Sequence, residues 1–374
     1  MVKILHTADW HLAKILNGKS LLDDQRYILR QIIELTRAEE IDAIIIAGDL
    51  YDRSIPPTEA VTLLNDTLYE LNVLRKIPIF AISGNHDSAE RLAFGSAWYE
   101  QNKLFLTSKL TNLIMPIEWN NIQFWLIPYH DALTARAVLQ DENIKSFDDA
   151  MQQIIAKIKE QQDPDKMQML VGHTFVAGGV PSDSERVLSV GNVDRVAVDT
   201  LADFDYVALG HLHHANALSH PKIQYSGSPL KYSFSEAKDN KSVNIIEIAN
   251  NKVVNIKKHP LKPMRDLRII EGYLDELIAH PVEQNEDYLQ INLLDEGALI
   301  DPIGKLRKIY PNILHLERAK KKLPTAQVEK FEDIIKKDDS ELFSQFFQFT
   351  KGKNLTTEQQ AIIKTAFTKV KGEE

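Results

Sequence analysis

Five short apolar segments of this 374-residue chain each run into a cluster of Asp, Asn or His side chains. The segments are nearly continuous in Ile, Leu, Val and Ala, which is typical of strands buried on both faces of a sheet covered by helices. Side chains at the carboxyl ends of such strands meet in one crevice. The pattern therefore predicts one site built from five distant segments. Their endings are Asp9-Trp10-His11, Gly48-Asp49, Gly84-Asn85-His86-Asp87, Gly172-His173 and Gly210-His211-Leu212-His213.

The residue types in these clusters indicate a pair of metal ions. The chain has no cysteine, so a metal must be held by oxygen and imidazole nitrogen, a donor set that suits manganese-like or iron-like ions. A metal pair needs a bridging oxygen donor and separate terminal ligands, and the clusters contain both kinds. Any one of these side chains alone could be a cap, a turn or a surface group. Their joint occurrence favours a phosphoesterase site with two metals.

Length and composition narrow the class of protein. A chain of 374 residues is long for a single core and predicts two or three domains. With 44% apolar and 26% charged residues it has the composition of an ordinary soluble protein, and no apolar run approaches the roughly 18 residues of a membrane span. The N-terminus enters a strand at once, without room for a signal peptide, so we expect a cytoplasmic location and no membrane. The net charge of -9 argues weakly against a nucleic-acid partner, although a local basic surface can coexist with it.

The first part of the chain, residues 1–264, has the pattern of a layered α/β domain. Strand runs alternate with helical faces at 21–38 and 58–74. Hairpin patterns at 114–127 and 243–257 add antiparallel strands, which predicts a sandwich with mixed sheets.

The rest of the chain divides into two smaller parts. Residues 265–323 contain two strand runs around a short helix, and predict a small α+β unit. Residues 324–374 contain two helical stretches, of which the second opens with Thr357 and Gln360 in a capping-box pattern. The expected elements are strands at 288–294 and 313–316 and helices at 302–309, 340–349 and 357–370.

The five motifs, in this order, resemble those of the calcineurin-like metallophosphoesterases, and are most similar to those of the bacterial SbcD nucleases. The resemblance covers essentially the whole chain. It implies a four-layer α/β/β/α sandwich at 1–264, a capping domain that helps to place DNA at 265–323, and a C-terminal helical region that binds a partner at 324–374. The segments most similar to SbcD are 6–12, 48–57, 84–88, 208–213, 225–230 and 261–265.

Carried over position by position, the resemblance implies seven ligands for two Mn²⁺ ions per chain, with Mg²⁺ or Fe²⁺ as alternatives. One metal is assigned to Asp9, His11 and His213, the other to Asn85, His173 and His211, and Asp49 bridges the two. The implied reaction is phosphodiester hydrolysis by water activated at the metal pair.

The residues around these ligands have roles that the sequence leaves open. In the family, the histidine at the position of His86 stands beside the scissile phosphate, where it protonates the leaving oxygen or stabilises charge. Asp87 is placed to orient His86, and a turn or cap role explains it equally well. Archaeal relatives carry a histidine at the position of Asp52, so a role of Asp52 in exonucleolytic positioning stays open. Arg53 either contacts substrate phosphate or is a solvated loop charge.

The segment 303–323 is basic in a chain that is acidic overall. It contains seven Lys or Arg and a single Glu, which predicts a surface for DNA phosphates beside the active cleft. A solvated face followed by a linker is the alternative. The basic residues are Lys305, Arg307, Lys308, Arg318, Lys320, Lys321 and Lys322.

The two C-terminal helices have more apolar surface than they can bury against each other. They either pack on their own chain or bind a partner, and the resemblance implies docking on the coiled-coil base of the ATPase SbcC. The chain has no Gly-x-x-x-x-Gly-Lys-Ser/Thr loop, which is consistent with another polypeptide handling ATP. The candidate contact residues are Phe343, Phe346, Phe347, Ile363 and Phe367.

Together these features predict a manganese-dependent DNA nuclease that acts as one component of a complex. By resemblance it works with SbcC as an ATP-dependent double-strand exonuclease and a single-strand endonuclease that opens hairpins, in DNA replication, recombination and repair. The resemblance also implies a homodimer through helices of the phosphoesterase domain. Leu64, Leu68 and Leu71 are candidate interface residues, although packing in the core of their own domain explains their apolar character equally well. One alternative is a phosphatase or nucleotidase, which leaves the cap and tail unexplained. Another is a non-enzymatic scaffold, which requires a broken metal site.

Overall fold

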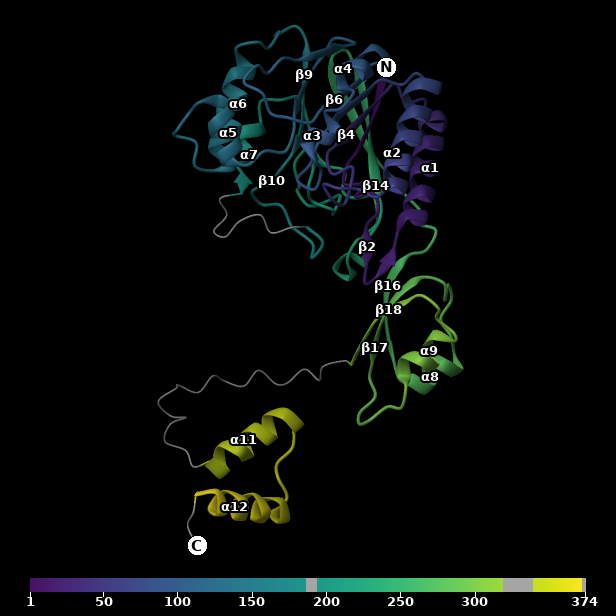
Figure 1. The fold of residues 1–374 in the computed structure, drawn as a ribbon, viewed down its shortest axis with the longest axis vertical. Helices are drawn as coiled ribbons and strands as arrows, with labels where there is room; N and C mark the ends of the chain where they lie inside the picture. The colour runs from purple at the N-terminus through teal and green to yellow at the C-terminus, as the bar shows by residue number, and fades with distance from the viewer. Residues whose placement is uncertain (186–193, 319–338, 372–374) are drawn as a thin grey trace.

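The apolar runs form the strands of two stacked sheets, in a computed structural model that describes residues 1–185, 194–318 and 339–371 (Figure 1). The first sheet has the order β15-β14-β1-β4-β5-β6. Strands β1, β4, β5 and β6 are parallel, whereas β14 runs antiparallel to β1 and β15 runs antiparallel to β14. Their bounds are β1 Val2–Thr7, β4 Ala43–Ala47, β5 Ile79–Ile82, β6 Leu104–Thr107, β14 Ser242–Ala249 and β15 Lys252–Pro260.

The second sheet has the order β13-β12-β9-β8-β7, with only its edge strand β7 antiparallel. Both predicted hairpins are therefore present. Strand β7 begins at Ile117, whereas the sequence predicts a strand that ends there. Ile114 lies outside the strand and is buried in the core beside the helices, and this burial accounts for its apolar character. The bounds are β7 Ile117–Trp119, β8 Ile122–Ile127, β9 Met167–His173, β12 Tyr206–Gly210 and β13 Ile223–Tyr225.

Helices cover the outer face of each sheet. Alternation along the strands divides the core: Leu5 and Ile44 pack on the helix side, while Ile4 and Ile45 face the second sheet. This arrangement confirms the predicted α/β/β/α layers. The first sheet is covered by α1 Leu22–Ala38, α2 Thr58–Leu68 and the π-helical η1 Tyr69–Leu74; the second by α5 Ala132–Leu139, α6 Phe147–Lys159 and α7 Val198–Leu201. Shorter elements are β2 Ile15–Leu16, β3 Lys19–Ser20, α3 Ala89–Leu92, α4 Ser96–Tyr99, η2 Glu100–Asn102, β10 Phe175–Val176, β11 Arg195–Val196 and η3 Phe234–Glu236.

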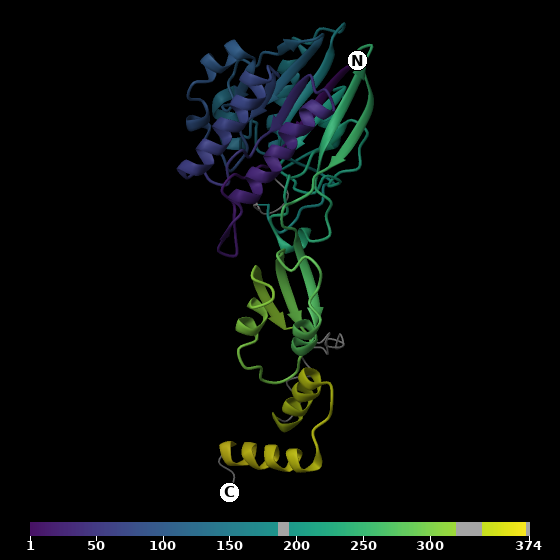
Figure 2. The ribbon, with the colours of Figure 1, turned by 90° about the vertical axis from the view of Figure 1, so that its right-hand side faces the viewer.

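The cap is a separate three-stranded parallel sheet of order β16-β17-β18 with two helices on one face (Figures 1 and 2). The sequence patterns missed its first strand and helix, because the short run Leu267–Gly272 is interrupted by Arg268 and Glu271 and keeps no regular alternation. Asp24 of α1 anchors the cap: its carboxylate accepts hydrogen bonds from Arg265 at 3.1 Å and from the Tyr288 hydroxyl at 2.7 Å. The bounds are β16 Leu267–Gly272, α8 Leu274–Ala279, β17 Tyr288–Leu293, α9 Pro302–Arg307 and β18 Ile313–Arg318.

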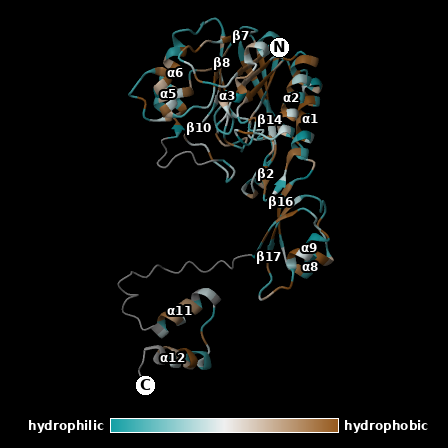
Figure 3. Ribbon diagram, viewed as in Figure 1, coloured by the Kyte–Doolittle hydropathy of each residue, from teal (hydrophilic) through white to brown (hydrophobic). Residues whose placement is uncertain are grey.

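The C-terminal helices α11 (Asp339–Lys351) and α12 (Thr357–Lys371) form a pair that stands apart from the sandwich and the cap (Figures 1 and 2). Both carry hydrophobic residues (Figure 3). The capping box lies one residue earlier than predicted, between Thr356 and Gln359, because Thr356 is the residue that precedes the helix. In the part of the chain that the structure describes, no helix has the length and apolar character needed to cross a membrane.

Candidate metal centre

The five clusters meet where β1, β4 and β5 of one sheet and β9 and β12 of the other end. Backbone hydrogen bonds join the loops that follow β1 and β4: the Asp9 amide donates to the Gly48 carbonyl at 3.0 Å, and the His11 amide to the Asp49 carbonyl at 2.9 Å. The structure therefore brings together all seven side chains that the resemblance assigns to metals.

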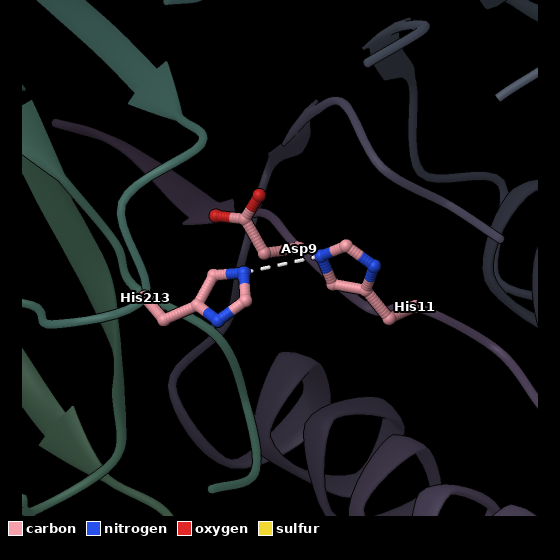
Figure 4. Close-up of side chains that lie close together, drawn as sticks. All are labelled: Asp9, His11 and His213. Atoms are coloured by element: carbon pink, nitrogen blue, oxygen red, sulfur yellow. Dashed lines mark hydrogen bonds between the residues drawn. The ribbon is translucent and has the colours of Figure 1, made fainter. Parts of the chain in front are cut away.

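The first donor group consists of Asp9, His11 and His213, whose donor atoms lie within 4.8 Å of one another (Figure 4). The Nε2 atoms of His11 and His213 are 3.1 Å apart. All three residues are buried. The Asp9 carboxylate also accepts the His211 backbone N–H at 2.9 Å, which ties this group to the end of β12.

The second donor group surrounds the side-chain oxygen of Asn85. His173 Nε2 lies 3.0 Å and His211 Nδ1 3.2 Å from Asn85 Oδ1. The carboxylate of Asp49 stands between the groups, since its Oδ2 is 3.4 Å from His11 Nε2 and 3.4 Å from His173 Nε2. This is the position that a bridging ligand requires.

The electrostatics of the site fit a bound cation. His173 Nδ1 donates to the Ala47 carbonyl at 2.8 Å, so in the neutral ring Nε2 carries a lone pair that faces two further acceptors, Asn85 Oδ1 and Asp49 Oδ2. Without a cation between them the protein protonates the ring: burial would lower the pKa of His173, but the carboxylates of Asp49 and Asp9 raise it to about 9. Donor atoms held about 2.1 Å from one ion lie roughly 3.0 to 3.4 Å apart, as they do here.

Glycines before the ligands make this crowding possible. A Cβ atom on Gly84 would lie 2.6 Å from Asp49 Cγ and closer still to the Asp49 backbone nitrogen. A Cβ on Gly48 would lie 2.8 Å from His173 Cγ, and the positive φ of 90° at Gly48 is also one that glycine adopts without strain. The Gly-Asp and Gly-Asn-His-Asp patterns thus have a packing cause.

His86 and Asp87 lie beside the donors. The His86 ring donates from Nδ1 to the Asp52 carbonyl at 2.9 Å and packs edge-on against His11 at 4.5 Å between ring centroids. The Asp87 carboxylate instead accepts the backbone N–H groups of Leu50, Tyr51 and Gly84 at 2.9 to 3.1 Å. The contacts of Asp87 are therefore those of a loop brace.

Asp52 and Arg53 border the site. The Asp52 carboxylate pairs with Lys14 at 3.0 Å and lies 3.6 Å from His11 Nδ1. Burial opposes ionisation of Asp52, but His11 and Lys14 outweigh it and lower its pKa. Arg53 has a side chain that is 56% exposed and lies 3.8 Å from Asp52, so it stands at the rim of the site.

Among the basic cap residues that the structure describes, the three on helix α9 are not brought to the metal site (Figure 1). Helix α9, which carries Lys305, Arg307 and Lys308, packs on one face of the cap sheet. Leu267 and Tyr288 belong to the opposite face and pack on the core of the sandwich. Arg318 ends β18, and Lys320, Lys321 and Lys322 lie outside the described residues.

A buried ion pair behind His213 escaped the sequence patterns. Ser184 Oγ contacts His213 Nδ1 at 2.6 Å and Glu236 Oε1 at 2.5 Å, and Lys241 Nζ lies 2.6 Å from Glu236 Oε2. Burial works against ionisation of Glu236, but His213 and Lys241 outweigh it and hold its pKa well below the usual range. Glu236 follows His213 by 23 residues and belongs to none of the recognised motifs, so the sequence patterns did not link the two residues.

Two helix-covered sheets with carboxylate and imidazole donors at their strand ends define a metal-dependent phosphoesterase. The family profile "Calcineurin-like phosphoesterase" matches residues 2–215, and "Type 5 capsule protein repressor C-terminal domain" matches residues 263–351. Two relatives are named as the D subunit of the nuclease SbcCD. The one from Staphylococcus epidermidis is 41% identical and covers 97% of each chain; the one from Staphylococcus saprophyticus is 40% identical and covers 98% of each. The chain therefore belongs to the SbcD nuclease family of calcineurin-like phosphoesterases.

A solved structure, a dimetal phosphatase from Danio rerio, is 13% identical, covers 70% of this chain and 96% of its own, and has a TM-score of 0.42. Family membership confirms the resemblance drawn from the motifs and makes the chain a hydrolase.

Proposed function

We propose that the chain is the DNA-cleaving component of a nuclease complex and holds two Mn²⁺ ions, with Mg²⁺ or Fe²⁺ as alternatives, in the two donor groups. The observation that carries this proposal is the Asp49 oxygen placed 3.4 Å from an imidazole nitrogen of each group, in a family whose relatives are named as nucleases. Bound metals would neutralise phosphate charge and make water a nucleophile near neutral pH. The proposed location is the cytoplasm.

The residues of the site have separate roles in metal binding, proton transfer and loop positioning. Asp9, His11 and His213 bind one ion, Asn85, His173 and His211 the other, and Asp49 both. His86 is fixed by donation from Nδ1 to the Asp52 carbonyl, so in the doubly protonated ring Nε2 is the nitrogen that can transfer its proton to the leaving oxygen, which leaves the ring neutral. Asp87 acts indirectly, because it holds the loops that carry Asp49 and His86.

Cleavage of DNA by purified chain tests the proposal. Linear duplex, hairpin and single-stranded oligonucleotides are incubated with Mn²⁺, with p-nitrophenyl phosphate as a parallel substrate. We expect Asp49→Ala to abolish metal binding at both groups and His86→Gln to keep it while slowing cleavage about 10²-fold to 10⁴-fold. His280→Gln, on an exposed residue of the cap, is the matched control.

Cleavage that survives Asp49→Ala would contradict the bridging role. Turnover of p-nitrophenyl phosphate without DNA cleavage, with and without the ATPase partner, would favour the phosphatase or nucleotidase alternative.

We further propose that residues 324–374 bind the ATPase SbcC through α11 and α12. The rings of Phe343 and Phe367 pack together with centroids 6.2 Å apart, while Phe346 and Ile362 remain 61% and 66% exposed. Phe347 and Ile363 are partly buried. Exposed apolar side chains on so short a helix pair support a partner surface.

A homodimer is proposed through the outer face of α2 and η1. Leu64 and Leu71 are buried in their own domain, so they belong to the core; Leu68 is partly buried. The surface beside them is apolar: Val61, Tyr69 and Val73 are 44%, 52% and 40% exposed and line a groove of about 330 Å³. Sedimentation of Val73→Glu, expected to be monomeric where wild type is dimeric, tests this interface.

For DNA, we propose that the cap (265–323) helps to position the duplex and that Lys305, Arg307 and Lys308 neutralise phosphates away from the cut bond. Their place on the helix side of the cap supports contacts at a distance from the metals. Replacing all three by Gln is expected to lower the salt dependence of DNA binding by roughly 0.9 for each phosphate that is no longer neutralised. An unchanged salt slope would remove α9 from the DNA surface.

A further inference from the structure

The polar groups behind His213 form a continuous chain that runs from the partly buried Ser184 to a buried ion pair. Ser184 Oγ lies 2.6 Å from His213 Nδ1 and 2.5 Å from Glu236 Oε1, and Lys241 Nζ lies 2.6 Å from Glu236 Oε2. Lys241 Nζ also donates to the His213 carbonyl at 2.8 Å. Glu236 is fully buried and Lys241 is 6% exposed. A buried ion pair gives little net stability, since desolvation offsets its attraction, so its presence here needs another cause.

The direction of the hydrogen bonds supplies that cause. The Glu236 carboxylate, paired with Lys241, can only accept, and Ser184 Oγ faces it at 2.5 Å. Ser182 Oγ also lies 2.8 Å from Ser184 Oγ, but its own proton goes to Glu185 Oε2 at 2.8 Å, so we assign the single hydroxyl proton of Ser184 to Glu236. Ser184 Oγ must then accept from His213, which places the ring proton on Nδ1. In the neutral imidazole the lone pair is consequently on Nε2, the atom that lies 3.1 Å from His11 Nε2 inside the first donor group.

We propose that Ser184, Glu236 and Lys241 are positioning residues that hold His213 in its metal-binding tautomer and fix the direction of its ring. This inference rests on the proposed metal function of the site. Partners that orient a ligating histidine in this way are worth about 10-fold to 100-fold in metal affinity. The competing explanation is mechanical: the same contacts simply attach the loop at Ser184 to η3.

Titration of the metal-free full chain with Mn²⁺, followed by calorimetry and by the electron paramagnetic resonance of free Mn²⁺, separates the two explanations. We expect wild type to bind two ions, and Ser184→Ala to weaken one of them about 10-fold to 100-fold. Ser184→Thr retains the hydroxyl and should restore the affinity. The matched control is Ser235→Ala: its hydroxyl accepts the Asp183 amide between the same two segments at 3.0 Å, away from His213.

A second readout follows the ring proton itself. In ¹⁵N-histidine-labelled, metal-free protein, long-range ¹⁵N–¹H spectra identify the tautomer of His213, with its signals assigned by their loss in His213→Gln. Wild type should show Nδ1–H, and Ser184→Ala a mixture of tautomers. Glu236→Gln should shift the ring further toward Nε2–H, because its amide can donate to Ser184 and reverse the hydroxyl.

The outcomes separate this inference from the proposed function. If wild type binds no Mn²⁺, the proposed function fails. If wild type binds two ions and Ser184→Ala binds them equally well with the His213 tautomer unchanged, the positioning role is overturned while the metal centre stands. Should Glu236→Gln fail to fold, the comparison of Ser184→Ala with Ser184→Thr decides alone.

Discussion

Replacing Gly84 by alanine should push the Asp49 carboxylate out of its place between the two donor groups. The added Cβ would lie 2.6 Å from Asp49 Cγ where ordinary contacts begin at 3.4 Å, so one of the groups must move by about 0.8 Å or more. The Asp49 backbone nitrogen is also in the way, so a side-chain rotation alone cannot relieve the clash. Asp49 Oδ1 accepts the His86 amide at 2.8 Å, and the movement would break this bond as well.

The cost can be estimated from these two losses. Overpacking of a buried site costs about 1–3 kcal/mol, and a lost hydrogen bond adds roughly 1 kcal/mol. For a domain of this size 1 kcal/mol corresponds to about 2–4 °C, so we expect Gly84→Ala to lower the melting temperature by roughly 5–15 °C. Mn²⁺ affinity should fall at both groups, because Asp49 contacts both.

Differential scanning calorimetry of metal-free protein and Mn²⁺ titration measure the two effects. Gly172→Ala is the matched control: it also precedes a ligand, His173, but its Cβ would meet only the Leu209 side chain, at an ordinary 3.4 Å. If Gly84→Ala has the melting temperature and the Mn²⁺ affinity of the control, an added Cβ does not displace the Asp49 carboxylate and the predicted crowding is refuted.

Three further predictions concern metal, cap and tail. Mn²⁺ at 100 times its dissociation constant should stabilise wild type by about 2.7 kcal/mol and so raise its melting temperature, while the melting temperature of Asp49→Ala should stay unchanged; equal shifts in both proteins would mean that the ions bind elsewhere. Asp24→Ala removes the buried anchor of the cap, should cost about 1–3 kcal/mol, and should speed proteolysis at 260–266; an unchanged digestion pattern would count against the anchor. Phe346→Asp should alter stability by less than about 0.5 kcal/mol yet weaken SbcC binding in a pull-down, whereas Ile300→Asp, on a residue 82% exposed in the cap, should not.

The strands of the sandwich could be predicted because the local sequence of each strand shows that it is buried. Runs such as Ala43–Ala47 are apolar at every position since both faces of the sheet are covered, and a strand of this kind is recognised without knowing its neighbours. The cap was predicted less completely. Its strand Leu267–Gly272 has exposed or partly exposed positions after the first residue, so its pattern is weak and its parallel pairing depends on β17.

In the site too, the features that were predicted are visible in a local stretch of sequence, and those that were missed depend on other segments. The proposed ligands were indicated by motifs at strand ends and by their resemblance to a known family, whereas the partners of those residues depend on contacts between distant segments. Asp87 adjoins His86 in sequence, yet it bonds the backbone of Leu50 and Tyr51. Glu236 carries a charge that local patterns place on the surface, and its burial is offset by Lys241 and by the Ser184 hydroxyl, which comes from a distant segment.

Backbone strain at the ligands explains why propensities could not have placed them. Four of the seven proposed ligands have positive φ: Asp9 at 55°, His11 at 44°, Asp49 at 51° and His211 at 98°. Such conformations cost on the order of 1–3 kcal/mol each and persist only where the surroundings impose them. Here the strands end and the Asp9 and His11 amides are bound to the neighbouring loop, so the chain turns sharply and directs each side chain inward. The strain is consistent with selection for the position of the donors over local stability, and a bound ion would restore part of that loss.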